Sequence, residues 1–345
     1  METPGGSEFT LTSTYLNTAS CGVLPRRAVA AITSLVDELA AGRPGGAGDY
    51  AVLGPARASF ARLSGVAEDR VAVGSSLAVQ VALVAAALPA GAEVLFPEGE
   101  YTSVVTPFAV RGDLALRYAP LEALADAVRP GTALVAFSAV QSADGRIADL
   151  AAVREAAAVH GARTLVDLSQ SAGWLPLDAG SFDYTVTCGY KFLLGLRGVC
   201  FLTVTEEAQQ TLRPLYAGTF ASVDWPLYGP VEHLAPTARR FDESPAYAAY
   251  HGAVESLALL EEVGVAAVHR HVTGLARRCT QGLASLGLPA AATDSAIVAV
   301  PGQGERLADL ARAGVVASAR AGNLRLSFHL YNTPAHVDRA LDALA

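Results

Sequence analysis

Short apolar runs alternate with longer amphipathic segments through the first half of the chain. The short runs are bounded by Gly, Pro or charged residues, as buried strands are. They predict strands at 70–73, 93–96, 114–118, 133–138, 164–167 and 184–188. Apolar residues spaced three and four apart predict helices at 25–42, 55–63, 77–88, 103–111, 121–128 and 150–160. This alternation is typical of βαβ units, so we expect an α/β fold with a mainly parallel sheet flanked by helices.

The pattern changes after about Trp225. Longer amphipathic segments and two apolar runs predict helix, helix, strand, strand and helix at 246–263, 266–286, 296–300, 324–328 and 335–345. We therefore expect an N-terminal arm at 1–15, a large domain at 16–225 and a smaller C-terminal α+β domain at 226–345. Ligands of parallel sheets bind beyond the carboxyl ends of the strands, so residues that follow strands are the first candidates for chemistry.

Composition narrows the class of protein. Of the 345 residues, 52% are hydrophobic and 17% are charged, which indicates a globular chain with a large core. The longest apolar stretches, such as Val79–Leu88, are too short to span a bilayer, and Met1–Thr14 lacks the features of a secretion signal. The four cysteines are scattered without CxxC spacing. We expect a reduced, cytoplasmic protein with no membrane partner.

Charge and histidine spacing argue against nucleic-acid and metal sites. The net charge is −8, and the paired arginines are isolated, so no basic patch is available for a phosphate backbone. The sequence has no HExxH motif, and His269 and His271 stand two residues apart in a predicted helix, where their side chains point in different directions. We expect neither a nucleic-acid partner nor a metal site.

A single lysine, Lys191, stands against 24 arginines. Arginine can replace lysine in most surface roles, but it cannot form a Schiff base, because its guanidinium does not lose its proton. Codon usage explains why lysines are few, although it does not explain where the remaining one lies. Lys191 follows the apolar run Tyr184–Cys188 and precedes Phe192–Gly195. Such surroundings favour an uncharged, nucleophilic amine.

Two further polar groups follow predicted strands. Asp167 ends the run 164–167, and a buried carboxylate near a Schiff-base lysine is the pairing that keeps a pyridine nitrogen protonated. Taken alone, an aspartate at a strand end is more often a cap or turn residue. Ser75 and Ser76 follow Gly74 at the start of a helix, where N–H groups and hydroxyls bind phosphate or simply form an N-cap. Neither a P-loop nor a GxGxxG motif is present.

An arginine lies inside an alternating strand near the C-terminus. Arg325 stands between Leu324 and Leu326, with Arg320 upstream. A cation that projects from an apolar strand has an anionic partner in most proteins. The partner is either a structural carboxylate or the carboxylate of a substrate, which a guanidinium binds through two hydrogen bonds.

Together these segments resemble the class V aminotransferase-like group of fold-type I pyridoxal phosphate (PLP) enzymes. The most specific parts are Asp167–Gly173, Thr187–Gly195 and Arg320–Thr333, and the resemblance runs from about Tyr15 to the end. The group includes cysteine desulfurases, kynureninase, isopenicillin N epimerase-like proteins and the C–S lyase of ergothioneine synthesis. The resemblance implies a large domain with a seven-stranded type of sheet, PLP as cofactor and a homodimer that shares its active sites.

The resemblance also implies a role for individual residues. Lys191 would carry the cofactor and move the α-proton, Asp167 would pair with the pyridine nitrogen, and Gln170 would bond the ring hydroxyl. Tyr101 would stack on the ring, although core packing would explain this tyrosine equally well. The phosphate would contact Ser75, Ser76, Cys188 and Tyr190, with Ser244 reaching it across the dimer interface. Substrate contacts would come from Arg325 for the carboxylate, and from Arg320, Asn17 and Gln141.

The sequence departs from the group in three places. Desulfurases carry a nucleophilic cysteine before the last arginine strand, whereas Gly314–Leu326 is short and has none. Ala139 stands where many relatives have an asparagine, and Tyr190 where many have a histidine. The segments Gln141–Gly145 and Tyr190–Leu193 look most similar to the ergothioneine-lyase branch, which favours a C–S lyase that acts on a cysteine-derived L-α-amino acid.

Other outcomes stay open at this point. The first alternative is an aminotransferase, and the second is an epimerase or decarboxylase. A non-catalytic PLP-binding protein is a further class, and it would bind the cofactor without reacting with any amino acid. If Lys191 is incidental, the chain is some other α/β enzyme and binds no PLP.

Overall fold

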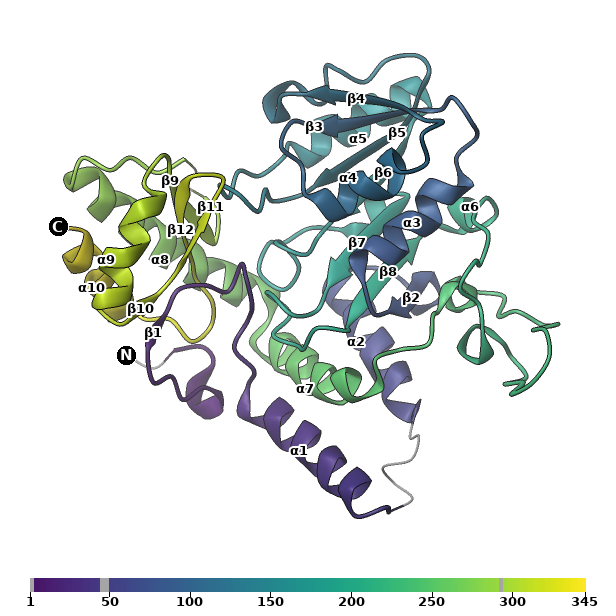
Figure 1. Cartoon of the computed structure of the whole chain (residues 1–345), viewed down its shortest axis with the longest axis horizontal. Helices are drawn as coiled ribbons and strands as arrows, with labels where there is room; N and C mark the ends of the chain where they lie inside the picture. The colour runs from purple at the N-terminus through teal and green to yellow at the C-terminus, as the bar shows by residue number, and fades with distance from the viewer. Residues whose placement is uncertain (1–2, 44–49, 292–293) are drawn as a thin grey trace.

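A computed structural model describes residues 3–43, 50–291 and 294–345 (Figure 1). Its centre is a seven-stranded sheet with the strand order β2-β8-β7-β6-β5-β3-β4. Neighbouring strands from β7 to β4 run parallel, and β8 is antiparallel to both β7 and β2. The expected mainly parallel sheet of seven strands is therefore confirmed. The strands are β2 (Val71–Gly74), β3 (Glu93–Pro97), β4 (Ala115–Ala119), β5 (Thr132–Ser138), β6 (Arg163–Asp167), β7 (Tyr184–Cys188) and β8 (Cys200–Val204).

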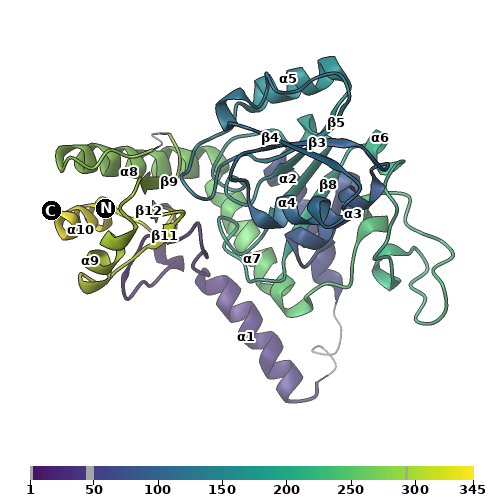
Figure 2. The ribbon, with the colours of Figure 1, turned by 45° about the horizontal axis from the view of Figure 1, so that its top comes forward.

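Helices cover both faces of this sheet because its strands are apolar on both sides. Along β3, Val94 and Phe96 pack with α3 and α4, while Leu95 packs on the opposite face with α5 (Figure 2). On the β2–β8 side, α2 and α7 pack against Val71, Val73 and Phe201. Such two-sided burial is typical of parallel α/β sheets. The helices are α1 (Arg26–Ala40), α2 (Leu53–Ser64), α3 (Leu77–Ala87), α4 (Thr102–Ala109), α5 (Leu150–His160), α6 (Glu206–Gln209) and α7 (Tyr247–Val263).

A second, smaller unit contains the C-terminal part of the chain. Its three-stranded antiparallel sheet has the order β11-β12-β9 and packs with α8 and α10. A separate two-stranded sheet pairs the N-terminal β1 (Thr14–Tyr15) with β10 (Val315–Val316), so the two ends of the chain meet here (Figure 1). The remaining elements are α8 (Val265–Ser285), β9 (Ile297–Val300), α9 (Leu307–Arg312), β11 (Ser318–Arg320), β12 (Asn323–Ser327) and α10 (Pro334–Leu344). The domain boundaries near residues 15 and 225 stay predictions.

One predicted helix is wrong. Residues 121–128 form a single 3-10 turn, η5 (Leu121–Ala123), followed by irregular turns. Leu121, Leu124 and Val128 are buried as the helical spacing required. The segment is nevertheless too short to sustain a helix, because Pro120 precedes it and Pro130 disfavours helical backbone at the residue before it.

Across the described residues, no helix combines the length and the apolar character needed to cross a bilayer.

Candidate active site

Lys191 and Asp167 lie at the carboxyl edge of the central sheet. Asp167 is the last residue of β6, and Lys191 follows the end of the neighbouring parallel strand β7. Both residues are buried: Asp167 is 3% exposed and Lys191 is 6% exposed. Burial raises the pKa of the Asp167 carboxyl, against the opposing effects of the positive charge of Lys191 and the N–H of Ser169, which donates to Oδ1 at 2.8 Å. The sheet therefore brings the predicted lysine and carboxylate together.

Two tyrosine rings flank the lysine. Nζ of Lys191 lies 5.3 Å from the ring centroid of Tyr101 and 5.6 Å from that of Tyr190. Tyr101 is the N-cap residue of α4, which places it at the same edge of the sheet. The two aromatic rings beside the amine also form a surface on which a flat ring can stack.

A pocket of about 190 Å³ opens beside these rings. Its lining includes five residues predicted from sequence: Ser75, Ser76, Tyr101, Cys188 and Tyr190. Ser76 is the N-cap of α3, so the first N–H groups of an 11-residue helix face this region. A Cβ at position 74 would lie 2.1 Å from Gln80 Nε2 and 2.7 Å from Glu243 Oε1, so a larger residue there would displace the ends of these two side chains. The pocket has the composition of an anion cradle.

Glu243 currently engages the same cradle. Its Oε1 accepts hydrogen bonds from the N–H of Ser75 and, at 2.8 Å, from the Ser75 hydroxyl. The neighbouring Ser244 is exposed, and among the described residues no hydrogen bond brings it to the pocket. Within the described part of this chain, the anion on the cradle is thus a carboxylate of the protein itself.

A second network links Gln170, which lies three residues after Asp167, to Arg325. Gln170 Nε2 donates to Ser142 Oγ at 3.1 Å, and the same oxygen accepts from Arg325 Nη1 at 3.1 Å. Arg325 also donates to Ser318 Oγ at 3.1 Å and to Ser20 Oγ at 2.7 Å. The guanidinium is buried, yet all of these partners are neutral. The network therefore joins the sheet edge to the smaller unit.

The remaining predicted residues lie around this network. Arg320 is exposed and reaches Ser20 Oγ at 3.2 Å. Asn17 pairs with Ser327 through a parallel β-bridge, and its buried Oδ1 has no hydrogen-bond partner. Gln141 is buried and donates to Glu100 Oε2 at 3.0 Å. Asn17 thus lies beside β12, the strand of Arg325.

Glu100 is a residue that the sequence analysis missed. Its buried carboxylate accepts from Ser138 N–H at 2.7 Å, Ser138 Oγ at 2.6 Å, Gln141 and the N–H of Tyr101 at 2.6 Å. The signal was present, because a glutamate directly after an apolar strand and before the candidate stacking tyrosine is unusual for a solvent-exposed turn. Arg197, also missed, lies over the Tyr190 ring, with Cζ 4.1 Å from its centroid. Burial raises the pKa of Tyr190 to about 12.

Comparison with known proteins identifies the family of this arrangement. The family model described as aminotransferase class-V matches residues 50–340. This chain belongs to the class-V aminotransferase family. An isopenicillin N epimerase of Streptomyces clavuligerus is 31% identical over an alignment of 386 positions, which covers 95% of this chain and 93% of that protein. An uncharacterized aminotransferase of Bacillus subtilis, YcbU, is 29% identical over 310 residues, which cover 84% and 82%.

Solved structures confirm the fold expected from the resemblance, fold-type I of the PLP-dependent enzymes. A cystine C–S lyase in complex with its product, cysteine persulfide, superposes with a TM-score of 0.85 at 23% identity and covers 96% of this chain and 97% of its own. A cysteine desulfurase from Thermococcus onnurineus gives 0.83 at 20% identity, with 96% and 94% coverage. Members of the class-V family are PLP-dependent enzymes, so this chain is one as well.

The described side chains of this class-V enzyme fit the cofactor. Gln170 Oε1 is buried and has no hydrogen-bond partner, so one polar atom at the sheet edge is available to a bound group. The buried Asp167 is suited to a pyridinium nitrogen. The donors of Ser75 and Ser76 are suited to a phosphate, which would take the place of the Glu243 carboxylate on Ser75.

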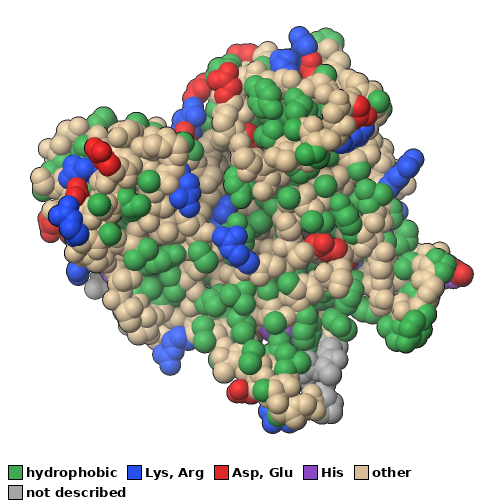
Figure 3. Space-filling view, in the orientation of Figure 1, with side chains coloured by type: hydrophobic (Ala, Val, Ile, Leu, Met, Phe, Trp, Pro, Cys, Tyr) green, Lys and Arg blue, Asp and Glu red, His purple; other side chains and the backbone are tan. Residues whose placement is uncertain are grey.

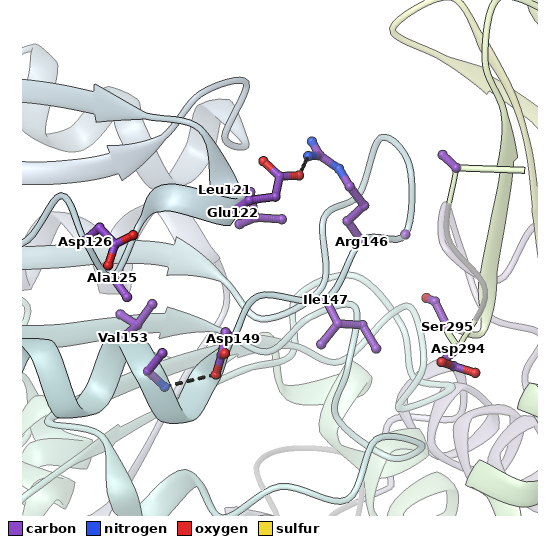
Figure 4. A pocket seen from close by; sticks show the side chains of 13 residues that line it. Leu121, Glu122, Ala125, Asp126, Arg146, Ile147, Asp149, Val153, Asp294 and Ser295 are labelled. Carbon is purple, nitrogen blue, oxygen red and sulfur yellow. Dashed lines mark hydrogen bonds and ion pairs between the residues drawn. The ribbon is translucent and has the colours of Figure 1, made fainter.

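A larger cavity lies apart from Lys191 and Asp167, and its lining contains none of the predicted cofactor-binding or substrate-binding residues. Its volume is about 700 Å³, and it lies between η5, the start of α5 and the residues before β9 (Figure 4). The one cation of its lining, Arg146, is paired with Glu122 and with Asp144. None of the predicted site residues lines this cavity.

Proposed function

We propose that this enzyme is a PLP-dependent C–S lyase that acts on a cysteine-derived L-α-amino acid by β-elimination. The observation that carries the proposal is the pairing of Lys191 with Asp167 at the carboxyl edge of the central sheet, which Gln170 and Ser142 link by hydrogen bonds to the buried Arg325 on β12. Lys191 would hold PLP, Asp167 the proton of its pyridine nitrogen, and Gln170 its ring hydroxyl, with the phosphate on Ser75 and Ser76. Tyr101 would stack on the ring, with Cys188, Tyr190 and the partner's Ser244 near the phosphate.

The chain's own groups supply binding and proton transfer. Arg325 would bind the α-carboxylate through its guanidinium fork, which orients the Cα–H bond toward Lys191. The Lys191 amine takes the proton from Cα, and the Cβ–S bond breaks with departure of the thiol. When bound, PLP supplies an electron sink for the pair left at Cα. Hydrolysis of the three-carbon remainder of the amino acid then gives pyruvate and ammonia.

The hairpin before Arg325 supports a lyase without a persulfide relay. β11 and β12 are joined by the two residues Ala321 and Gly322, both with positive φ, as in a tight hairpin turn. Such a turn leaves no loop on which a nucleophilic cysteine could stand, and Gly314–Leu326 contains no cysteine. The fold likeness to a cystine C–S lyase points to the same chemistry.

The decisive experiment is visible absorbance of the purified protein with and without S-substituted L-cysteines. We expect a PLP band, borohydride-trappable label on Lys191 and steady pyruvate release without any keto acid. Lys191→Ala abolishes the band and the label; Lys191→Arg keeps the positive charge and serves as matched control, with the same loss expected. A protein that stays colourless with added PLP would contradict the proposal.

Transamination is the second candidate, favoured by the similarity to the uncharacterized aminotransferase of Bacillus subtilis. It predicts stoichiometric bleaching that only a keto acid reverses. Epimerisation predicts exchange of the α-proton with solvent and no pyruvate.

We also propose a homodimer in the cytoplasm. Apolar side chains are exposed on the segment between α6 and α7, notably Leu227 at 78% and Tyr228 at 91% (Figure 3). Single apolar side chains on a surface are ordinary, but a run of them in one segment fits a subunit interface. The four cysteines are free thiols, which fits a reducing compartment.

A further inference from the structure

Two arginines meet at one hydroxyl beside the proposed substrate site. Arg325 on β12 donates from Nη2 to Ser20 Oγ at 2.7 Å, and Arg320 on β11 donates from Nη2 to the same oxygen at 3.2 Å. A hydroxyl oxygen has two lone pairs and accepts from both. The guanidinium groups are therefore held side by side at the junction of the N-terminal segment and the β11–β12 hairpin.

Neither arginine has a charged partner among the described residues. Arg325 bonds only Ser142, Ser318 and Ser20, and Arg320 bonds only the carbonyl of Ala319 and Ser20. Twelve other arginines do form ion pairs, namely Arg27, Arg43, Arg57, Arg62, Arg111, Arg117, Arg129, Arg146, Arg163, Arg278, Arg306 and Arg312. Burial and the charge of Arg320 lower the pKa of Arg325 to about 10. Arg325 is a buried cation without a charged partner, and Arg320 places a second positive charge beside it, so this place favours anions from outside the chain.

The depth of the two groups differs. Arg325 is 1% exposed and is tied through Ser142 to Gln170, on the cofactor side of the site. Arg320 is exposed at the turn of the hairpin. An α-carboxylate must lie near Lys191 and hence with Arg325, whereas the end of a substrate side chain extends outward to Arg320. One carboxylate therefore neutralises only the inner cation.

We infer that the substrate carries a second carboxylate on its side chain, which Arg320 binds while Arg325 binds the α-carboxylate. This inference rests on the proposed function for its site and names the class of substrate: amino acids with an anionic side-chain end. An exposed arginine–carboxylate contact contributes a modest but selective amount of binding.

The test compares S-carboxymethyl-L-cysteine with S-carbamoylmethyl-L-cysteine, which match in shape and differ in charge. We expect kcat/KM for the acid to exceed that for the amide by at least about tenfold. Arg320→Gln is expected to remove this preference by weakening the acid alone, whereas Arg325→Gln weakens both. Arg312→Gln, an exposed arginine on α9, is the matched control and leaves both unchanged. Equal use of acid and amide by the wild type overturns the inference, as does an equal loss of both in Arg320→Gln, which would place Arg320 on the α-carboxylate.

A binding measurement separates this inference from the proposed chemistry. Glutarate and its half-amide, glutaramate, have no amine and cannot react, so calorimetric titration of the PLP-loaded protein reports on the arginines alone. Tighter binding of glutarate that Arg320→Gln abolishes supports the inference even if no S-substituted cysteine yields pyruvate. Equal binding of the two compounds, together with pyruvate release, overturns it while the lyase proposal stands.

Discussion

Glu100 holds Tyr101 and Gln141 in place through a single buried carboxylate. Its carboxylate fixes the backbone of Tyr101, whose ring faces Lys191, and the amide of Gln141. All of its hydrogen-bond partners are donors, so a carboxylate fits this position and an amide, with its own N–H groups, does not.

Glu100→Gln is therefore expected to lower kcat/KM by up to about 100-fold through displacement of Tyr101 and Gln141. It should also cost about 1–3 kcal/mol of stability, because a donor is left facing buried donors. Steady-state kinetics, the PLP band and urea unfolding measure these effects. Glu98→Gln, exposed on the same turn, is the control. Unchanged kinetics with lost stability would reduce Glu100 to a structural role.

Because the neutral ring of His329 is buried, we expect the free energy of unfolding to fall at acid pH. Its ring is fully buried, with Nε2 2.9 Å from the carbonyl of Phe192, and burial lowers the pKa to about 4 from an ordinary 6.5. As the pH falls, the His329 ring gains its proton in the unfolded chain before it does so in the folded chain. The stabilising contribution is thus complete above pH 6.5 and is lost between 6.5 and 4, by an amount on the order of 3 kcal/mol.

Unfolding free energies at pH 7 and 4.5 measure this loss. In His329→Gln, the difference between the two pH values should shrink relative to wild type. His233→Gln, at an exposed histidine, should leave the difference unchanged. An unaltered acid slope in the His329 variant would contradict the prediction.

The residue scale also shows which candidate residues a sequence alone can propose. Lys191 and Asp167 were predicted because their neighbours are apolar and each follows a strand, which are local properties. Glu100 was missed because its partners, Ser138 and Gln141, lie 38 and 41 residues away and come close only through the β3–β5 pairing. No local pattern contains that pairing.

At the scale of elements, a buried ion pair fixes the edge of the sheet. Arg57 on α2 bonds Asp242, which follows the 3-10 helix η8 (Ala238–Phe241), at 2.6 Å. Asp242 also accepts from Val73 N–H on β2 at 2.8 Å. Burial raises the pKa of Asp242, and the charge of Arg57 opposes this. Together these contacts set the position of Glu243 at the anion cradle.

Arg57→Met is expected to cost about 3–5 kcal/mol, because it leaves an uncompensated buried carboxylate. The double variant Arg57→Met with Asp242→Leu should recover part of that loss. Arg62→Met, which breaks the exposed pair with Glu261, should cost at most about 1 kcal/mol. Urea unfolding distinguishes these cases, and an equal effect of Arg57→Met and Arg62→Met would disprove the assignment.

Element prediction failed where pairing is long-range or marginal. Cys200–Val204 reads as a continuous apolar run, and its role as β8, inserted antiparallel between β2 and β7, depends on a partner strand far earlier in the chain. The wrong helix prediction at 121–128 has a different cause. The apolar residues there are buried as a helix would require, but the segment has too few residues to propagate a helix. Strands and helices with strong local patterns were predicted to within a few residues.

At the scale of the whole molecule, the exposed apolar segment before α7 predicts that two copies of the chain associate through this segment. Leu227→Glu with Tyr228→Glu is expected to shift the protein from dimer to monomer and to weaken PLP binding, since charged groups would be buried in the interface. Sedimentation velocity measures the first effect and absorbance titration the second. Val159→Glu, at an exposed valine on α5, is the control. A wild type that is monomeric at micromolar concentration would refute this prediction.

The meeting of Ser20 with Arg320 has a consequence for biosynthesis. The two residues are 300 positions apart, and the pairing of β1 with β10 spans a similar distance. At roughly 5–20 residues per second, a ribosome needs on the order of 15–60 s to supply the second partner after the first has emerged. Throughout that interval the N-terminal segment, including the eventually buried Leu16, waits in water without its strand. The surroundings of Ser20 are therefore completed last, and a chain released before Arg320 is made would keep Lys191 and Asp167 but lack both arginines that we propose to bind the substrate.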